Sequence, residues 1–189
     1  MLPFPNSARR PPVNTSIRLA STLALVAAIS LPATARAQSA NFNLAGGFSL
    51  ANGDFGQRND AGYSIGVGIG MTQAGSPLSF RADGIYNEFN TKSNLGKSRA
   101  GGIIASVLYD FAMKDASFTP YAIGGVGLYS TREADLINDE SDTNVGWSLG
   151  AGIRIPLSGF SAYIESRYHS ISSAPGGVAF APVVFGLRF

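Results

Sequence analysis

The stretch "VGWSLGAGIRIPL" (residues 145–157) alternates between two kinds of side chain with a period of two. Every second residue is apolar, and the residues between them are small or polar, as at Ser148, Gly150 and Arg154. This period is typical of a β-strand whose two faces meet different surroundings. Residues 63–72 repeat the pattern, so the chain is predicted to contain strands with one apolar face and one small, polar face.

Eight segments of this kind can be read along the chain, and helical periodicity is hard to find. The segments are residues 41–51, 61–72, 78–89, 99–112, 118–131, 143–155, 160–172 and 178–189. Each has the length to cross a membrane as a tilted strand, which takes about ten residues. The fifth segment alternates poorly, because Val126 and Leu128 fall opposite Tyr121 and Ile123, and its facing stays open.

The connections between these segments alternate between long and short. "QAGSP" (73–77) and "KDAS" (114–117) are short, and each lies between two longer connections. Outer-membrane barrels have short periplasmic turns and longer external loops, whereas a soluble sandwich has no reason to sort its loops in this way. We therefore expect the long connections to face the cell exterior: residues 52–60, 90–98, 132–142 and 173–177.

The first 37 residues have the pattern of a secretory signal peptide. Arg9, Arg10 and Arg18 precede the apolar run "LASTLALVAAISL" (19–31), and small residues at Ala35 and Ala37 follow it. The alternative is an N-terminal membrane anchor, but the run is shorter than the ~20 residues of a spanning helix. We expect cleavage after residue 37 and a single barrel domain over residues 38–189.

The charge of the chain does not indicate a nucleic-acid partner. Four of the fourteen basic residues and none of the twelve acids lie in residues 1–37, so the remaining chain is slightly acidic. The chain has no cysteine, which excludes disulfides and thiolate metal sites. It also lacks a phosphate-binding glycine loop and a metal triad, so no cofactor is expected.

Aromatic residues on the apolar faces fall at two levels, as in the belts of a membrane barrel. A soluble barrel or sandwich, the alternative, would turn its apolar face inward. The residues at the short-turn level are Phe42, Phe80, Phe111, Phe160 and Phe189, and those at the long-loop level are Tyr63, Tyr86, Trp147 and Tyr168.

Three stretches resemble the small outer-membrane β-barrel family that includes the membrane domain of outer membrane protein A and protein X. They are "YAIGGVGLY" (121–129), "GWSLGAGIRIPL" (146–157) and "FAPVVFGLRF" (180–189), within a resemblance over residues 40–189. The resemblance implies an all-β fold, an eight-stranded antiparallel up-and-down transmembrane β-barrel. It also implies an assembly signal, read by the outer-membrane assembly machinery, at Val183, Phe185, Leu187 and Phe189.

The polar faces would line the interior of such a barrel, and they carry seven charged residues. Eight strands leave an interior that side chains fill, so these charges need partners. We expect a plug of ion pairs, and the alternative is a gated polar path. The residues are Arg81, Asp83, Asp110, Arg154, Glu165, Arg167 and Arg188.

Two further features are weak indications of chemistry. His169 is the only histidine, and lipid A deacylases, which are similar barrels, keep a His-x-Ser pair; here Ile171 occupies the position of that serine. We therefore interpret His169 as an interfacial residue without a catalytic role. The acidic loop at residues 131–142 could hold a divalent cation, but it lacks the ordered spacing of a calcium loop, and a solvated loop is favoured.

These observations predict a monomeric, non-enzymatic protein of the cell outer membrane. Its role would be structural, in envelope integrity, or in surface interaction such as adhesion through the external loops. The alternatives are a narrow porin-like solute channel and, less favoured, a lipid A-modifying hydrolase. The expected partners are outer-membrane lipid and lipopolysaccharide, the assembly machinery and an unidentified surface ligand.

Overall fold

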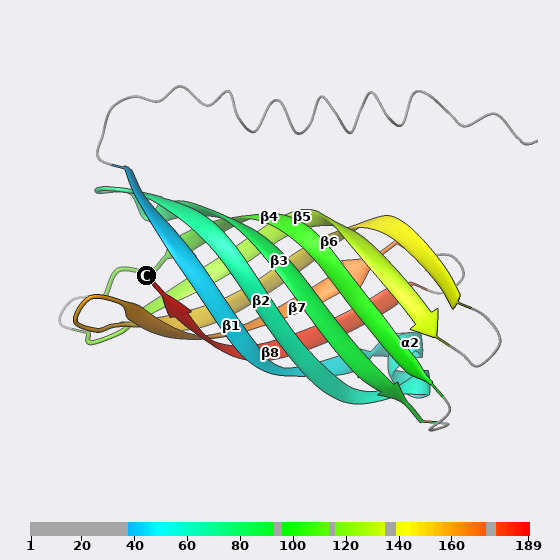
Figure 1. Cartoon of the computed structure of the whole chain (residues 1–189). Helices are drawn as coiled ribbons and strands as arrows, with labels where there is room; N and C mark the ends of the chain where they lie inside the picture. The colour runs from blue at the N-terminus through cyan, green and yellow to red at the C-terminus, as the bar shows by residue number, and fades with distance from the viewer. Residues whose placement is uncertain (1–37, 93–95, 114–115, 135–138, 173–176) are drawn as a thin grey trace, which may run out of the picture. The chain divides into compact units, whose positions relative to one another are not determined.

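The computed structural model describes residues 38–92, 96–113, 116–134, 139–172 and 177–189. Eight antiparallel strands follow one another around a closed barrel, each paired with its neighbours in the sequence (Figure 1). The strands are β1 (Gln38–Asn52), β2 (Asn59–Gln73), β3 (Leu78–Thr91), β4 (Lys97–Asp110), β5 (Thr119–Ala134), β6 (Asp139–Pro156), β7 (Ser161–Ile171) and β8 (Val178–Arg188). The predicted eight-stranded up-and-down barrel is confirmed.

The barrel closes where the first strand meets the last. β1 and β8 pair from Asn43↔Arg188 to Asn52↔Ala179. Beyond this register, Phe42 N donates to Phe189 O at 3.0 Å and Phe189 N donates to Phe42 O at 2.9 Å. Closure leaves no strand edge within the ring, which a membrane requires because its interior offers no hydrogen-bond partners.

The outward face of the barrel is apolar and exposed. Ile103, Ile69 and Val126 are 72%, 67% and 63% exposed, values that a soluble protein would avoid for contiguous aliphatic side chains. This arrangement fits the family-level expectation that the strands cross a membrane with lipid outside. In the described part of the chain, no helix is long and apolar enough to cross a membrane.

The fifth strand alternates more regularly than its sequence suggests. Tyr121 and Ile123 are buried at 2% and 1% exposure, whereas Val126 and Leu128 are 63% and 55% exposed. Tyr121 and Ile123 therefore face the interior and Val126 and Leu128 face outward. The strand had looked irregular because its inward residues are themselves apolar.

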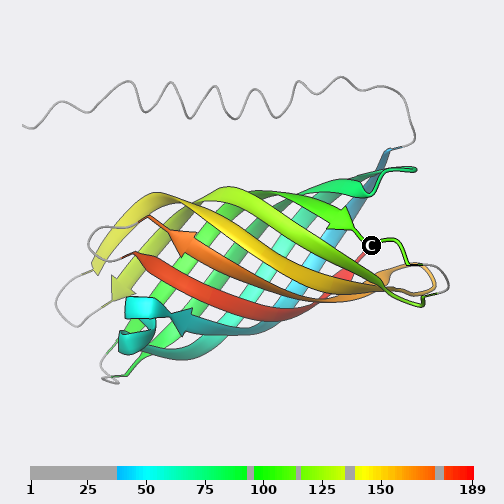
Figure 2. The ribbon, with the colours of Figure 1, turned by 180° about the vertical axis from the view of Figure 1, so that it is seen from behind.

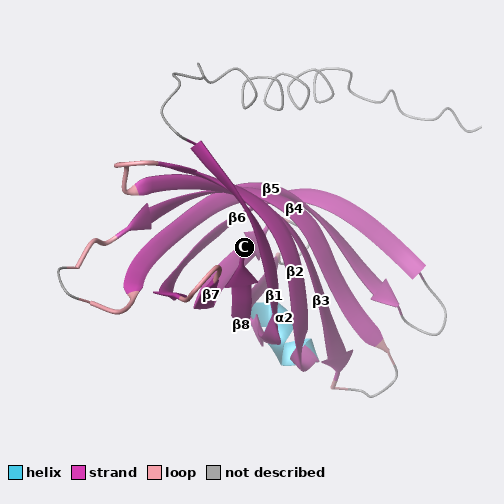
Figure 3. Cartoon of the chain, turned by 60° about the vertical axis from the view of Figure 1, so that its left-hand side comes forward, coloured by secondary structure: helices cyan, strands magenta, loops and turns pink. Residues whose placement is uncertain are grey.

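The two ends of the barrel differ, and we call them the turn end and the loop end. The turn end carries the short connections, in which Gly75 (φ 76°) and Gly159 (φ 89°) adopt the left-handed conformation that favours glycine. The loop end carries the short helix α2 (Gly53–Arg58), which lies between the end of β1 and the start of β2 (Figure 3). This helix falls in a connection that the sequence predicted only as a long loop.

Candidate functional site

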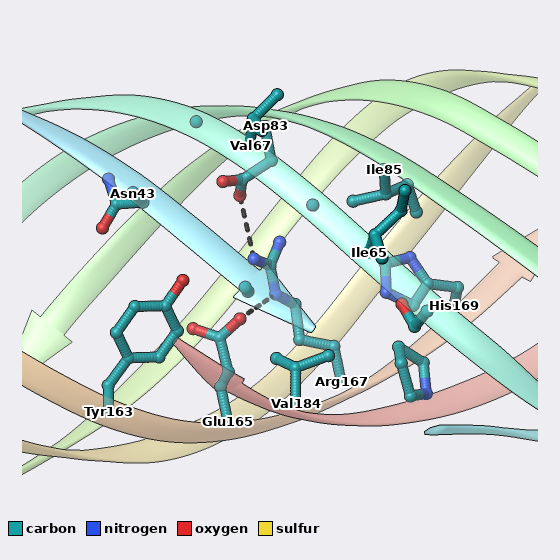
Figure 4. Close-up of a pocket in the computed structure, with 15 residues that line it drawn as sticks. Asn43, Ile65, Val67, Asp83, Ile85, Tyr163, Glu165, Arg167, His169 and Val184 are labelled. Atoms are coloured by element: carbon teal, nitrogen blue, oxygen red, sulfur yellow. Dashed lines mark hydrogen bonds and ion pairs between the residues drawn. The ribbon is translucent and has the colours of Figure 1, made fainter. Parts of the chain in front are cut away.

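Four buried charged residues form a closed ring of ion pairs inside the barrel. Arg81 and Asp83 come from β3, and Glu165 and Arg167 come from β7. Arg81 Nη2 lies 2.7 Å from Glu165 Oε2, and Arg81 Nε lies 2.9 Å from Asp83 Oδ2. Arg167 Nε lies 2.6 Å from Glu165 Oε1, and Arg167 Nη2 lies 2.9 Å from Asp83 Oδ2 (Figure 4). Each charge thus contacts two of opposite sign, and we call this group the charge ring.

Tyrosines pack around the charge ring on the side of the turn end. Tyr121 donates its hydroxyl to Glu165 Oε2 at 2.7 Å, and the guanidinium of Arg81 lies 5.7 Å from the ring centre of Tyr163. Tyr163 packs against Gly186 and Tyr121 against Gly152, at positions where an added Cβ would overlap the aromatic ring. These glycines therefore make room for flat aromatic side chains in the lumen.

The other three predicted lumen charges lie nearer the turn end. Arg154 Nη1 pairs with Asp110 Oδ2 at 2.8 Å, and the Arg154 guanidinium lies 5.1 Å from the ring centre of Tyr121. Arg188 donates from Nη2 to the hydroxyl of Thr72. Six of the seven charges thus form ion pairs, whereas Arg188 forms no direct ion pair among the described residues.

The loop-end part of the lumen contains an apolar cluster, which the sequence analysis did not foresee. Buried polar side chains such as Asn87 and Ser98 lie at the same end, and Phe55 of α2 reaches into the cluster at 3% exposure. Phe55 meets Phe89 edge-on at 5.1 Å, and Phe89 meets Phe180 at 5.8 Å. The sequence did contain a signal for this cluster, because apolar residues occupy several positions that alternation assigns to the inward face. The cluster comprises Phe55, Phe89, Ala100, Ile104, Tyr129, Ile171, Val178 and Phe180.

His169 lies at the boundary between the charge ring and the apolar cluster. It is 1% exposed, its Nδ1 lies 2.9 Å from the Tyr129 hydroxyl oxygen, and its ring stacks on Phe180 at 4.9 Å. The interpretation of His169 as an interfacial residue is therefore wrong. Ile171, at the position of the deacylase serine, is itself buried in the apolar cluster.

Two cavities lie in the lumen of the described barrel. The larger cavity, lined by Asp83, Tyr163, Glu165, Arg167 and His169 among others, holds about 30 Å³ (Figure 4). A second cavity, near Arg154 and Arg188, holds about 10 Å³. The larger cavity is roomy enough to hold ordered water, and its polar lining offers hydrogen-bond partners. Within the described ranges, no three His, Cys, Asp or Glu side chains are placed to hold a metal ion.

The predicted interfacial aromatics lie on the outward face in pairs. Trp147 and Tyr168 lie 5.8 Å apart, and Tyr63 and Tyr86 lie 6.1 Å apart, both pairs toward the loop end. At the turn end Phe160 stacks on Phe189 at 6.1 Å. The remaining members, Phe42, Phe80 and Phe111, are each close to half exposed. Their placement at the membrane interfaces stays a prediction.

The four residues of the predicted assembly signal share the outward face of the last strand. Val183, Phe185 and Leu187 lie opposite Phe48, Gly46 and Leu44 of β1, and Phe185 is 56% exposed. Their recognition by assembly machinery stays a prediction.

Two sequence predictions fall largely outside the described residues. They are the signal peptide at residues 1–37 and the side chains at 133–141 of the acidic loop, including Glu133, Asp135, Asp139 and Glu140.

The comparisons with known proteins identify the class. The model of the outer membrane protein β-barrel domain family matches residues 21–189, and the chain belongs to this family. No curated protein matches the chain. Neisserial surface protein A is similar in structure, with a TM-score of 0.65 and 18% identity over 80% of this chain and 97% of that one. The N-terminal β-barrel domain of Pseudomonas aeruginosa OprF has a TM-score of 0.51 and 14% identity over 79% and 96%. The protein is thus a β-barrel of the cell outer membrane.

Proposed function

We propose that this protein is a non-conducting outer-membrane barrel that acts by surface interaction at its loop end. One observation carries the proposal: β5 and β6 continue past the ends of β7 and β8 at the loop end (Figure 2). β6 pairs with β5 as far as Asp139, but its register with β7 begins only at Gly146↔Ile171.

Among the described residues, no strand pairs with the projecting part of β6 on the side of β7. Ser172 N donates to Val145 O at 3.1 Å, and within the described ranges this is the last bond toward β7 on that side. Because alternate residues of a strand turn their backbone groups to opposite sides, Ser141 and Thr143 turn theirs to the free edge. Such an edge can accept an extended segment of a partner through main-chain hydrogen bonds.

The contents of the lumen favour this role over the solute channel. The charge ring and the apolar cluster are two successive layers of packed side chains, and hydration of either layer would break existing contacts. The position of His169 inside these layers is also the reason that we propose no hydrolase activity. In this proposal the barrel anchors the protein in the membrane, and the loop end binds the partner.

The experiment compares two proline variants expressed in cells. Thr143→Pro removes an N–H that points to the free edge, and Asn144→Pro is the matched control because its N–H points toward β5. Adhesion of intact cells to protein-coated surfaces is measured, together with sensitivity to detergent as a measure of envelope integrity. We expect T143P to fold, shown by heat-modifiable gel mobility, and to lower adhesion without changing detergent sensitivity.

The opposite outcome is equally clear. If folded T143P adheres like the wild type while cells that lack the barrel become sensitive to detergent, the role is envelope integrity and the free edge is not its site.

A further inference from the structure

Charged side chains on the outward face gather in one place. Among strand residues whose side chains are described, and apart from Asp60 in the irregular start of β2, four charged residues alternate onto the outward face. They are Glu88 on β3, Lys97 and Arg99 on β4, and Arg132 on β5. Glu88 lies opposite Arg99, and Arg99 lies opposite Arg132. We call this group the outward cluster, and it has three cations and one acid.

Glu88 holds two of the cations in position. Its carboxylate accepts bonds from Lys97 Nζ at 2.6 Å, Arg99 Nε at 3.0 Å and the Tyr86 hydroxyl at 3.0 Å. Glu88 is nearly buried beneath its partners, but the side chains of Lys97 and Arg99 remain 53% and 40% exposed. Glu88 engages only Nε of Arg99, so both Nη nitrogens can donate to a further acceptor.

The outward cluster lies beyond the exposed aliphatic residues of its strands, toward the loop end. Ile103 is 72% exposed and lies opposite Leu128. It lies four positions further along β4 than Arg99. At about 3.3 Å per residue this is about 13 Å along a tilted strand. Tyr86, two residues below Glu88, pairs with Tyr63, and such rings are typical of the interface level. If these rings mark the outer interface, the cations are just above the apolar band, at the level of lipid phosphates.

We propose that Lys97, Arg99 and Arg132 bind the phosphate groups of lipid A in the outer leaflet. Arginine matches phosphate oxygens through paired N–H groups, and lysine supplies a point charge. Lys97 and Arg99 outnumber Glu88, the acid that they contact, which matches an anionic lipid, and no comparable group occupies the described outward face at the turn end. The proposal rests on the loop end facing the cell exterior and is independent of the surface-interaction role.

The test measures lipid binding by the full chain, expressed in cells and purified from their outer membranes. The barrel is placed in phosphatidylcholine nanodiscs containing lipid A, dephosphorylated lipid A or phosphatidylglycerol, and bound lipid is counted by native mass spectrometry. We expect preference for intact lipid A, with affinity about tenfold weaker in K97Q/R99Q, since charge-assisted hydrogen bonds are lost. R132Q should weaken binding less, and E88Q should strengthen it by removing the competing anion.

A matched control is Lys92→Gln, which removes a lysine whose Nζ donates to Gly56 O of α2 rather than to the outward cluster. It should leave lipid binding unchanged. Gel mobility verifies folding of each variant, and R132Q serves alone if the double variant fails to fold. Equal binding of dephosphorylated lipid A would overturn phosphate recognition. Equal binding of phosphatidylglycerol would overturn lipid A as the source, and wild-type affinity in K97Q/R99Q would overturn the site.

Discussion

Arg81 and Glu165 join opposite walls of the barrel. One guanidinium nitrogen of Arg81, Nη2, contacts both carboxylate oxygens of Glu165, at 2.8 Å and 2.7 Å. Their strands, β3 and β7, are separated by three strands in either direction around the ring. The contact therefore spans the lumen and braces the barrel across its width.

Loss of one acid from the charge ring should be strongly destabilising. In Glu165→Gln, Arg81 and Arg167 would share only Asp83, which leaves a buried charge uncompensated. Removing one partner of a buried ion pair costs about 3–5 kcal/mol. Urea unfolding of the barrel in lipid vesicles measures the change in the free energy of unfolding. Asp54→Asn, at an exposed position of α2, is the control and is expected to cost under ~1 kcal/mol. Equal effects of the two variants would contradict the brace.

The barrel should carry no steady ion current in planar bilayers. Two layers close the lumen, so the double variant Arg81→Ser with Glu165→Ser should also stay closed because the apolar cluster remains. Single-channel recording in concentrated potassium chloride measures both. A steady current from the wild type would overturn the closed lumen, and a current from the double variant alone would make the charge ring the sole barrier.

Phe55 should hold α2 against the mouth of the barrel. Phe55→Ala removes its contact with Phe89 and its packing in the apolar cluster, and truncating a buried phenylalanine costs about 3–5 kcal/mol. Because the loss falls on a local element, we expect local opening with the barrel intact. Tryptic cleavage after Arg58 should become faster, measured on the folded protein by mass spectrometry. Gln57→Ala, an exposed neighbour, should cleave at the wild-type rate, and equal rates in both variants would contradict the anchoring role.

The strands followed from the sequence because alternation is a local property. Leu78 begins a strand as predicted, and the inward position of Arg81 and Glu165 follows from the period of two. The contact between these two side chains does not follow from the sequence, because contacts across the lumen depend on the stagger of all eight strands. The sequence could therefore place each charge on a face but could not assign its partner.

The apolar cluster in the lumen was missed for a different physical reason. A narrow barrel is filled by side chains, so an inward residue such as Ile123 or Phe180 needs only to be buried, not polar. Helix α2 was missed because Gly53 and Gly56 are poor helix formers. Its stability comes from packing of Phe55 inside the barrel, and the local sequence does not contain that contact.

The loop end should face the cell exterior. The chain has no cysteine, so single cysteines report position without background. Asp54→Cys on α2 and Ser158→Cys in the turn after β6 are both at exposed positions at opposite ends of the barrel. A membrane-impermeant maleimide applied to intact cells should label the first and not the second. The reverse pattern would invert the topology and with it the lipid A proposal.

Phe189 should matter more for assembly in cells than for stability. Its backbone closes the barrel with two hydrogen bonds to Phe42, and these survive in Phe189→Ala. The lost side chain is worth at most about 1.5–3 kcal/mol by apolar burial. In Phe189→Ala, a signal read from the last strand by the assembly machinery would lose one of its outward residues. The fraction of the protein that folds in cells should therefore fall strongly, while the stability of the refolded protein changes little.

The matched control is Phe160→Ala, because Phe160 stacks on Phe189 at 6.1 Å but belongs to the turn before β7. Both variants lose a similar aromatic contact at the same end of the barrel. Heat-modifiable gel mobility is compared for protein made in cells and for the same chain refolded in detergent. F189A should fold poorly only in cells, and F160A should behave alike in both settings. Equal assembly of the two variants in cells would mean that Phe189 contributes an interfacial ring and nothing more.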